Sequence, residues 1–338
     1  MLGTHELPLW FEVASLVVLA AILVIDLVVV GRRPHVPSFA ESARWVAFYV
    51  GLALVFALLV LTVGGSAPAG EFLAGWLTEY SLSLDNLFVF ALIMGSFAVP
   101  HLQQQRTLMI GILIALVLRA GLILVGAAII ERFSWVFYLF GVVLLVTAVK
   151  MVGGQNEEEY SENVLVRVVR RVMPVAPDYD GARLTTRIDG RRMVTPMLLV
   201  ILALGTTDLL FALDSIPAIF GLTSDPFIVF SANIFALMGL RQLYFMLDGL
   251  MERLAYLSYG LAAVLAFIGV KLILEALHGN TVPFINGGQG VPWAPEIPTW
   301  LSLAVIIGFL AIAAVASLLW PPRVQDTQDT QDAEDASR

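Results

Sequence analysis

The 338-residue sequence contains no cysteine, only two lysines among its 19 basic residues, and few charges overall. Without cysteine the chain has no disulfides, thiolate metal sites, iron–sulfur clusters or cysteine nucleophiles. Charged residues make up 14% of the chain, against about 25% in soluble proteins. The formal net charge of −8 argues against nucleic acid as a partner. Composition therefore argues against a soluble enzyme.

Hydrophobic residues, by contrast, make up 59% of the chain. A membrane-spanning helix needs about 20 mostly apolar residues, because the hydrocarbon core is about 30 Å thick. The turn residues of segment 64–71 predict a loop there. We therefore expect an all-α polytopic membrane protein with about nine transmembrane helices. The predicted spans are 8–31, 43–63, 72–98, 107–130, 134–151, 195–221, 226–247, 254–276 and 298–320.

The distribution of arginine predicts the orientation of these spans. The first apolar run precedes Arg32 and Arg33, an order typical of a signal anchor and not of a cleaved signal peptide. With the N-terminus outside, every arginine of the loops falls inside except Arg132. We therefore expect a multi-pass protein with its N-terminus outside, its C-terminus in the cytoplasm and lipid around it.

An internal repeat relates segment 72–151 to segment 195–276. Each copy has three spans: the first carries two acids six residues apart, the second an arginine and the third a lysine. Because three is odd, the second copy is expected to be inverted in the membrane. Such 3+3 inverted repeats are common in secondary transporters, with the substrate site near the midplane. The matching positions are Glu79 with Asp208, Asp85-Asn86 with Asp214-Ser215, Arg119 with Arg241, and Lys150 with Lys271.

Two segments outside the spans have a distinct character. Residues 164–173 alternate apolar residues with arginines, which predicts a short basic helix on the inner membrane surface. The C-terminal tail is acidic and repetitive, which is typical of disorder. The predicted organisation is two N-terminal helices (1–71), the first repeat (72–151), a basic cytoplasmic loop (152–194), the inverted second repeat (195–276), an exterior loop (277–297), the last helix (298–320) and the tail (321–338).

The acids within the spans are the main functional signal. A carboxylate at the bilayer centre costs about 2.5–3.5 kcal/mol on insertion scales, so these groups must face the interior, pair, take up protons or bind a cation. One interpretation is that they only neutralise Arg119 and Arg241. Two arginines, however, cannot offset the four acids of the repeats, or five when Asp26 is counted. The excess favours a cation or proton pathway, and Asp26 belongs either to that pathway or to an interhelical hydrogen bond.

The spacing of the acids constrains the site. Six residues along an unbroken helix correspond to about 9 Å of rise and about 120° of net rotation, so one ion cannot contact both acids of a helix. Either the helices break, for which Pro217 is a candidate position, or there are two levels of site. Because the repeats are antiparallel, Asp85 is expected to share a level with Asp208, and Glu79 with Asp214.

The candidate ligands are all oxygens. Asn86 and Ser215 add neutral oxygens to the carboxylates, and such sets suit Mg²⁺, Ca²⁺ or Mn²⁺. The histidines lie in loops or at helix ends, and Asn233 is interpreted as a helix–helix contact. No nucleophile–base pair and no phosphate-binding loop stands out, so we expect no enzymatic activity and no resident cofactor.

Three stretches resemble the TerC family of bacterial membrane proteins, which is named for tellurite resistance and belongs to the LysE transporter superfamily. They are residues 79–90 (EYSLSLDNLFVF), 207–218 (TDLLFALDSIPA) and 233–241 (NIFALMGLR). The resemblance implies manganese export across the bacterial inner membrane. It also implies a metal site that consists of Glu79, Asp85, Asn86, Asp208, Asp214 and Ser215. This sequence departs from a symmetric site in one respect, because the two halves have Glu79 and Asp208 at equivalent points.

The sequence therefore predicts a secondary transporter that exports a divalent metal, with Mn²⁺ as the first candidate. Asp26, Arg119 and Arg241 are expected to serve charge pairing or a proton pathway. Two alternatives stay open: a transporter of another cation such as Ca²⁺, and a membrane scaffold in metal or tellurite stress. The oligomeric state also stays open.

Overall fold

The computed structural model describes residues 7–32, 37–133, 135–153, 164–181, 183–188, 191–250, 256–280, 282–283 and 285–319. Eight helical spans in these ranges are long and apolar enough to cross a membrane, and α5 is a shorter apolar helix of 17 residues. The prediction of an all-α polytopic membrane protein is confirmed. The elements are α1 (Leu9–Arg32), α2 (Phe39–Gly64), α3 (Ser66–Ser96), α4 (His101–Arg132), α5 (Val136–Val152), α6 (Val164–Val172), β1 (Thr185–Ile188), β2 (Arg191–Val194), α7 (Pro196–Phe220), α8 (Pro226–Met238), α9 (Leu240–Leu250), α10 (Leu257–His278), a 3₁₀ turn (Asn286–Gly288) and α11 (Thr299–Leu319).

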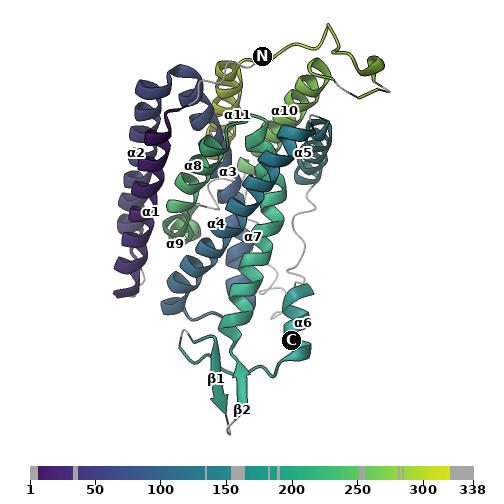
Figure 1. Cartoon of the computed structure of the whole chain (residues 1–338). Coiled ribbons are helices and arrows are strands. Elements are labelled where there is room, and N and C mark those ends of the chain that lie inside the picture. The colour runs from purple at the N-terminus through teal and green to yellow at the C-terminus, as the bar shows by residue number, and fades with distance from the viewer. Residues whose placement is uncertain are drawn as a thin grey trace, which may run out of the picture.

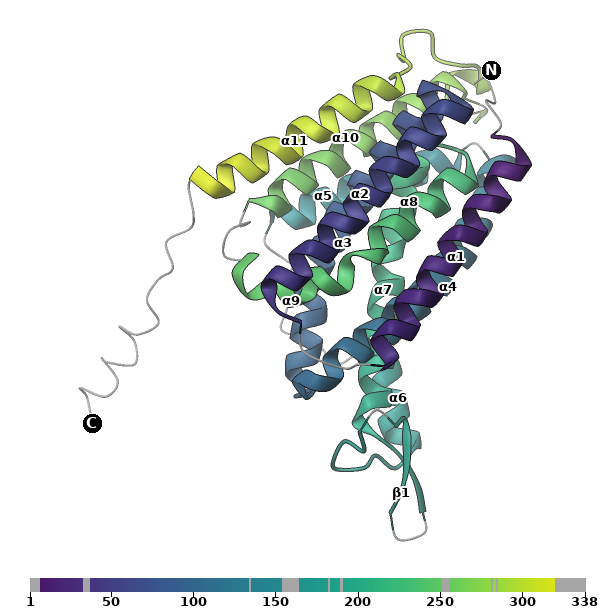
Figure 2. The same cartoon turned by 90° about the vertical axis from the view of Figure 1, so that its left-hand side faces the viewer.

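The long helices form one bundle, and α6 with the β-hairpin projects from one end of it (Figure 1). We call this the hairpin end. The opposite end, here the distal end, carries the α2–α3 turn, the α7–α8 turn and the connection from α10 to α11 (Figure 2). The peripheral helices expose large apolar side chains, as a lipid-facing surface requires. Examples are Val17, Leu58, Val117, Leu124 and Ile312.

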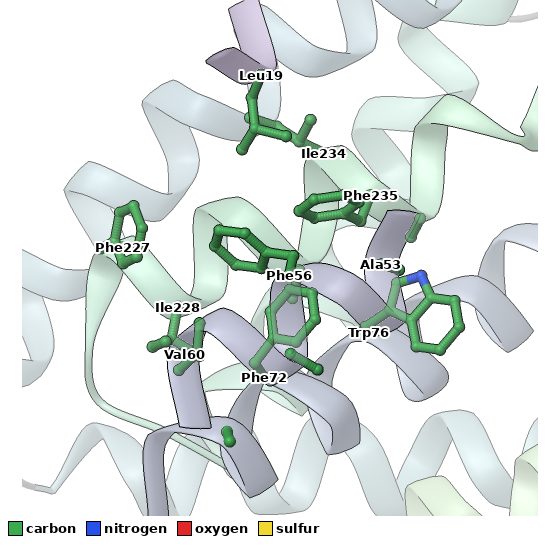
Figure 3. Packing of buried hydrophobic residues seen from close by; sticks show 14 of the residues in the cluster. Leu19, Ala53, Phe56, Val60, Phe72, Trp76, Phe227, Ile228, Ile234 and Phe235 are labelled. Carbon is green, nitrogen blue, oxygen red and sulfur yellow. The ribbon is translucent and has the colours of Figure 1, made fainter. Parts of the chain in front are cut away.

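An aromatic cluster joins the N-terminal helices to the bundle. Phe56 of α2 lies 4.9 Å, ring centre to ring centre, from both Phe72 of α3 and Phe235 of α8. Leu19 of α1 and Trp76 of α3 belong to the same buried cluster (Figure 3). Such tilted and edge-to-face ring pairs add to the packing energy of the buried area. The first two helices are therefore integral to the fold.

The most extensive helix contacts join the two predicted repeats. They are α5 with α10, α3 with α8, and α4 with α7. Exchanging α3 with α7, α4 with α8, and α5 with α10 maps this set of contacts onto itself. An inverted repeat would produce this pattern, and the repeat itself stays a prediction.

The α5–α10 pair depends on two glycines that face each other. A Cβ added at Gly269 would lie 2.9 Å from the carbonyl oxygen of Gly141, and one added at Gly141 would lie 2.8 Å from that of Gly269. At both glycines an added Cβ would meet the backbone of the other helix, so any side chain there would force the two helices apart. Small residues at such crossings are the usual basis of close helix packing in membranes.

We expect Gly269→Ala to destabilise the protein by about 1–3 kcal/mol, the usual cost of overpacking a tight contact. The matched control is Gly121→Ala in α4, where an added Cβ meets nothing within 4 Å. The measurement is the Tm of purified protein in one detergent. Equal Tm values for the two variants would mean that α5 and α10 do not need this close approach.

The loop predicted at 64–71 is wrong. The expected loop at 64–71 is reduced to Gly65, whose φ of +88° ends α2, and α3 begins at the next residue. Pro68 lies in the first turn of α3, where a missing N–H costs no helical hydrogen bond. The span predicted at 226–247 is present as the apolar stretch Pro226–Met246, in which Gly239 separates α8 from α9. Helix α7 runs continuously through Pro217, so the helix break, one of the two alternatives considered, is absent there.

The segment between the repeats contains the predicted basic helix, α6, and an antiparallel hairpin, β1–β2, which was not predicted. Val166 of α6 is buried in the cluster that includes residues of α7, so one side of α6 packs on protein. The Tyr179 hydroxyl donates a 2.7 Å hydrogen bond to the carbonyl oxygen of Phe97, and burial raises the pKa of this phenol. The guanidinium of Arg170 lies 5.6 Å from the centre of the Phe97 ring. This segment is therefore docked on the hairpin end of α3.

Candidate functional site

Arg119 of α4 is the centre of a buried polar cluster. Its Nε and Nη2 each donate a 3.0 Å hydrogen bond to one carboxylate oxygen of Asp208 on α7. Its Nη1 forms an ion pair with Glu79 of α3 and lies 3.4 Å from the hydroxyl oxygen of Ser215. The structure thus brings four of the predicted residues together from three helices.

The cluster is buried and carries an excess of acids. The side chains of Glu79, Arg119 and Asp208 are each at most 3% exposed. Two carboxylates share one guanidinium, so the formal charge is −1 when both are ionised. Glu79 Oε2 accepts no hydrogen bond from the described residues. Buried charge of one sign is costly, so the cluster has the chemistry to attract a hard cation or a proton.

The helix register gives levels one residue away from the expected pairs. A Cβ added at Gly75 of α3 would lie 3.4 Å from Cγ2 of Ile219 on α7, which fixes where the antiparallel helices cross. Four residues further toward the hairpin end, the backbones of Glu79 and Ser215 lie at one level. A further seven residues bring Asn86 to the level of Asp208. Arg119 therefore joins the two levels through its side chain.

Asp85 and Asn86 follow two turns after Glu79 on α3. The structure places the backbone of Asp85 in the unbroken helix, while its side chain lies outside the described residues. Asn86 is half-buried and takes part in none of the hydrogen bonds of the Arg119 cluster. The backbone register alone therefore relates these two positions to Asp208.

Asp214 is separated from the Arg119 cluster. It is half-buried and accepts a 3.0 Å hydrogen bond from the Thr147 hydroxyl of α5, with Lys150 close enough to interact electrostatically. Asp208 and Ser215 are seven residues apart and share one helix face, whereas Asp214 is rotated by about 100° from Ser215. Among the described side chains, no group of three or more acids and histidines lies close enough to hold one metal ion. The six predicted ligands do not form a single coordination shell in this state.

Arg241, which matches Arg119 in the predicted repeat, pairs outside the repeats. Its Nη2 donates a 3.0 Å hydrogen bond to Oδ1 of Asp26 on α1, and the Tyr49 hydroxyl of α2 donates a 3.0 Å bond to the same oxygen. Asp26 thus takes part in hydrogen bonds between helices, one of the two roles expected for it. The Nη1 of Arg241 is buried and has no hydrogen-bond partner within the described ranges.

Asn233 of α8 is a further candidate ligand, although the sequence analysis interpreted it as a helix–helix contact. Val229, Ile123 and Ile216 pack together in one buried cluster. Each of these residues has a neighbour one helical turn closer to the hairpin end: Asn233, Arg119 and Ala212, respectively. Asn233 therefore lies at the level of Arg119. Its side chain is fully buried, and neither amide atom has a hydrogen-bond partner among the described residues. A satisfied helix–helix contact would show such a partner, and its absence makes Asn233 a candidate ligand.

Comparison with known proteins identifies the family. The family model "Integral membrane protein TerC family" matches residues 64–325. "Uncharacterized membrane protein Rv2723" of Mycobacterium tuberculosis is 49% identical, over 91% of this chain and 79% of the relative. A Myxococcus xanthus protein, "Uncharacterized membrane protein STKORF319", is 43% identical over 92% of both chains.

The same comparison finds "Putative membrane-bound redox modulator Alx" of Escherichia coli, which is 38% identical over 88% of this chain and 91% of the relative. No solved structure matches the chain. The family model covers most of the chain, including every membrane acid of the Arg119 cluster. The protein belongs to the TerC family of integral membrane proteins.

Proposed function

We propose that this protein is a secondary transporter that exports a divalent metal, Mn²⁺ in the first place, through the carboxylates of the repeats. The observation that carries the proposal is the buried cluster of Glu79, Arg119 and Asp208, where two acids from different helices share one fixed cation. A cluster of this charge in a membrane protein is expensive, and such groups mark ion pathways by default. Asp214, Asn233 and the register of Asp85 extend the oxygen-rich region around it.

The proposed direction of transport follows from arginine. Arginines lie on α6 and on both strands of the hairpin, at 167, 170, 171, 187, 191 and 192. The positive-inside rule therefore assigns the hairpin end to the cytoplasm and the distal end to the exterior. Export moves the ion from the hairpin end to the distal end.

Arg119 has a specific part in this proposal. In the metal-free protein its guanidinium pairs with both Glu79 and Asp208, and an arriving cation must compete with it. A fixed internal cation of this kind keeps the metal ion from staying bound, because the guanidinium pairs with the two carboxylates again when the ion leaves. No nucleotide-binding motif stands out in the sequence, so the energy is proposed to come from an ion gradient. Proton exchange fits, since carboxylates that bind metal release protons.

The name of the Escherichia coli relative points to redox modulation. This chain has no cysteine, so thiol chemistry could not carry such a role here. A change in metal content would be an indirect route to redox effects. The scaffold alternative differs in one respect: it does not need the membrane acids.

The test is total cellular manganese, calcium and magnesium in manganese-loaded cells that express the wild type, Glu79→Gln or Asp85→Asn at matched membrane levels. We expect the wild type to lower manganese alone and both variants to lose this effect. Lower calcium in place of manganese would transfer the proposal to Ca²⁺. A wild type that changes no metal would contradict transport and favour the scaffold.

A further inference from the structure

A second polar cluster lies at the distal end of the bundle, apart from the Arg119 cluster. We infer that Glu71, Lys271 and Glu275, together with the Thr223 hydroxyl, form a separate station for a divalent cation, at which Lys271 replaces the ion when the station is empty. Its role as the last binding step before release rests on the proposed function.

One half of the station is a face of α10. Lys271 and Glu275 are four residues apart and therefore adjacent on one side of the helix. Lys271 is only 8% exposed, and Glu275 is half-buried. The Lys271 ammonium interacts electrostatically with the carboxylates of Glu71 and Glu275. Within the described part of the chain it forms neither a hydrogen bond nor a direct ion pair.

The other half comes from α3 and the α7–α8 turn. The Thr223 hydroxyl donates a 2.6 Å hydrogen bond to Oε2 of Glu71, and the backbone N–H of Asp225 donates a 3.2 Å bond to the Thr223 oxygen. The turn rests on α10, because a Cβ added at Gly221 would lie 2.6 Å from Cγ2 of Ile268. The turn thereby holds Glu71 over the α10 face that carries Lys271.

The charge balance of the station points to a cation. Two carboxylates face one ammonium, while the nearby Asp225 is engaged as the N-cap of α8 and accepts a 2.8 Å bond from the backbone of Phe227. A buried lysine with only a structural role would form a direct ion pair, whereas Lys271 interacts electrostatically with two acids and forms no direct ion pair with a described residue. Carboxylate and hydroxyl oxygens at such a position suit a hard divalent cation.

The station also leads to the surface. One turn beyond Glu275 on α10 is His278, whose Nε2 lies 3.1 Å from a carboxylate oxygen of Glu296. Both side chains are largely exposed. The acids of α10 and of the α10–α11 connection thus continue from the buried station to the distal surface of the protein, in the direction proposed for release.

The repeat pattern supplies an independent parallel. Lys150 on the third helix of the first repeat interacts with Asp214 on the first helix of the second repeat. Lys271 on the third helix of the second repeat interacts with Glu275 on its own helix and with Glu71 on α3, the helix that begins the first repeat. Each lysine thus interacts with an acid on a helix of the other half of the bundle, and Lys271 in addition with one on its own helix. This arrangement suits groups whose pairing changes when the two repeats move against each other.

The experiment uses everted membrane vesicles, whose interior corresponds to the cell exterior, and measures Mn²⁺ uptake against increasing Mn²⁺ preloaded inside. A release station binds this trapped ion and slows transport. Lys271→Gln removes the competing ammonium and should lower the half-inhibitory internal Mn²⁺ by about tenfold, whereas Glu71→Gln and Glu275→Gln should raise it by about tenfold. The opposite signs cannot both arise from misfolding. The matched control, Glu12→Gln at the distal end of α1, should behave as the wild type.

Unchanged inhibition in all three variants, with normal wild-type uptake, would overturn the station and leave the proposed function intact. If the wild type takes up no Mn²⁺, the proposed function fails, and the station is then tested by Mn²⁺ binding alone. This binding is measured by equilibrium dialysis of the purified full-length protein against Mn²⁺. Loss of one bound ion in the Glu71→Gln, Glu275→Gln double variant supports the station, and an unchanged stoichiometry overturns it.

Discussion

Asp214→Asn is expected to reduce Mn²⁺ export to below about a tenth of the wild-type rate, because a carboxylate ligand of a divalent ion loses its charge. The folded protein should tolerate the change. Asp214 is hydrogen-bonded to Thr147 and is not held by Arg119, and an amide oxygen can accept the same bond. Among the acids of the repeats whose side chains are described, Asp214 thus best separates transport from folding.

The measurement pairs Mn²⁺ uptake into everted vesicles with the Tm of the purified variant. The matched control is Asp180→Asn, which changes an exposed acid that pairs with Arg183 at the hairpin end. Thr147→Ala, which removes the hydrogen bond and keeps the charge, is expected to slow export only partly. Wild-type export by Asp214→Asn would remove this residue from the proposed pathway.

The fold was largely predictable because long apolar runs give a strong signal of membrane-spanning helices. The positions of the spans followed from apolar runs, and the charged residues in them had to face the interior. The local deviations have particular causes. Pro68 looked like a loop residue but lies in a first helical turn, where proline is tolerated. The dipeptide Asp189-Gly190, typical of a hairpin turn, was present in the sequence and overlooked next to the more conspicuous α6.

The residues of the site were predictable from the sequence, whereas the contacts between them were not. The sequence selected Glu79, Arg119 and Asp208, yet the spacing rule alone could not tell that Arg119 joins both levels. A rotation of about 100° per residue separates Asp214 from Ser215, so the pair cannot serve one cluster. Asn233 is polar but carries no charge, so the sequence alone favoured a helix–helix hydrogen bond for it. Its importance became visible only through its burial without a partner.

Arg119→Met is expected to have the largest effect on stability. It leaves Glu79 and Asp208 buried without a counter-ion, and removing one partner of such a pair costs about 3–5 kcal/mol. The double variant Arg119→Met, Asp208→Asn should recover part of this loss, because only one carboxylate then remains. Arg241→Met should cost less, since its partner Asp26 is 25% exposed and can be hydrated.

The same variant tests whether Arg119 competes with the transported ion. Without the guanidinium, the two carboxylates are neutralised either by protons or by one divalent cation, so Mn²⁺ no longer competes with a fixed cation. Mn²⁺ should therefore raise the Tm of Arg119→Met more than it raises the Tm of the wild type, since a ligand stabilises in proportion to its affinity for the folded state. Uptake by this variant should saturate at lower Mn²⁺ and turn over more slowly, because nothing displaces the bound ion. An equal Mn²⁺-induced shift in both proteins would mean that Arg119 is a static counter-ion and that the cation binds elsewhere.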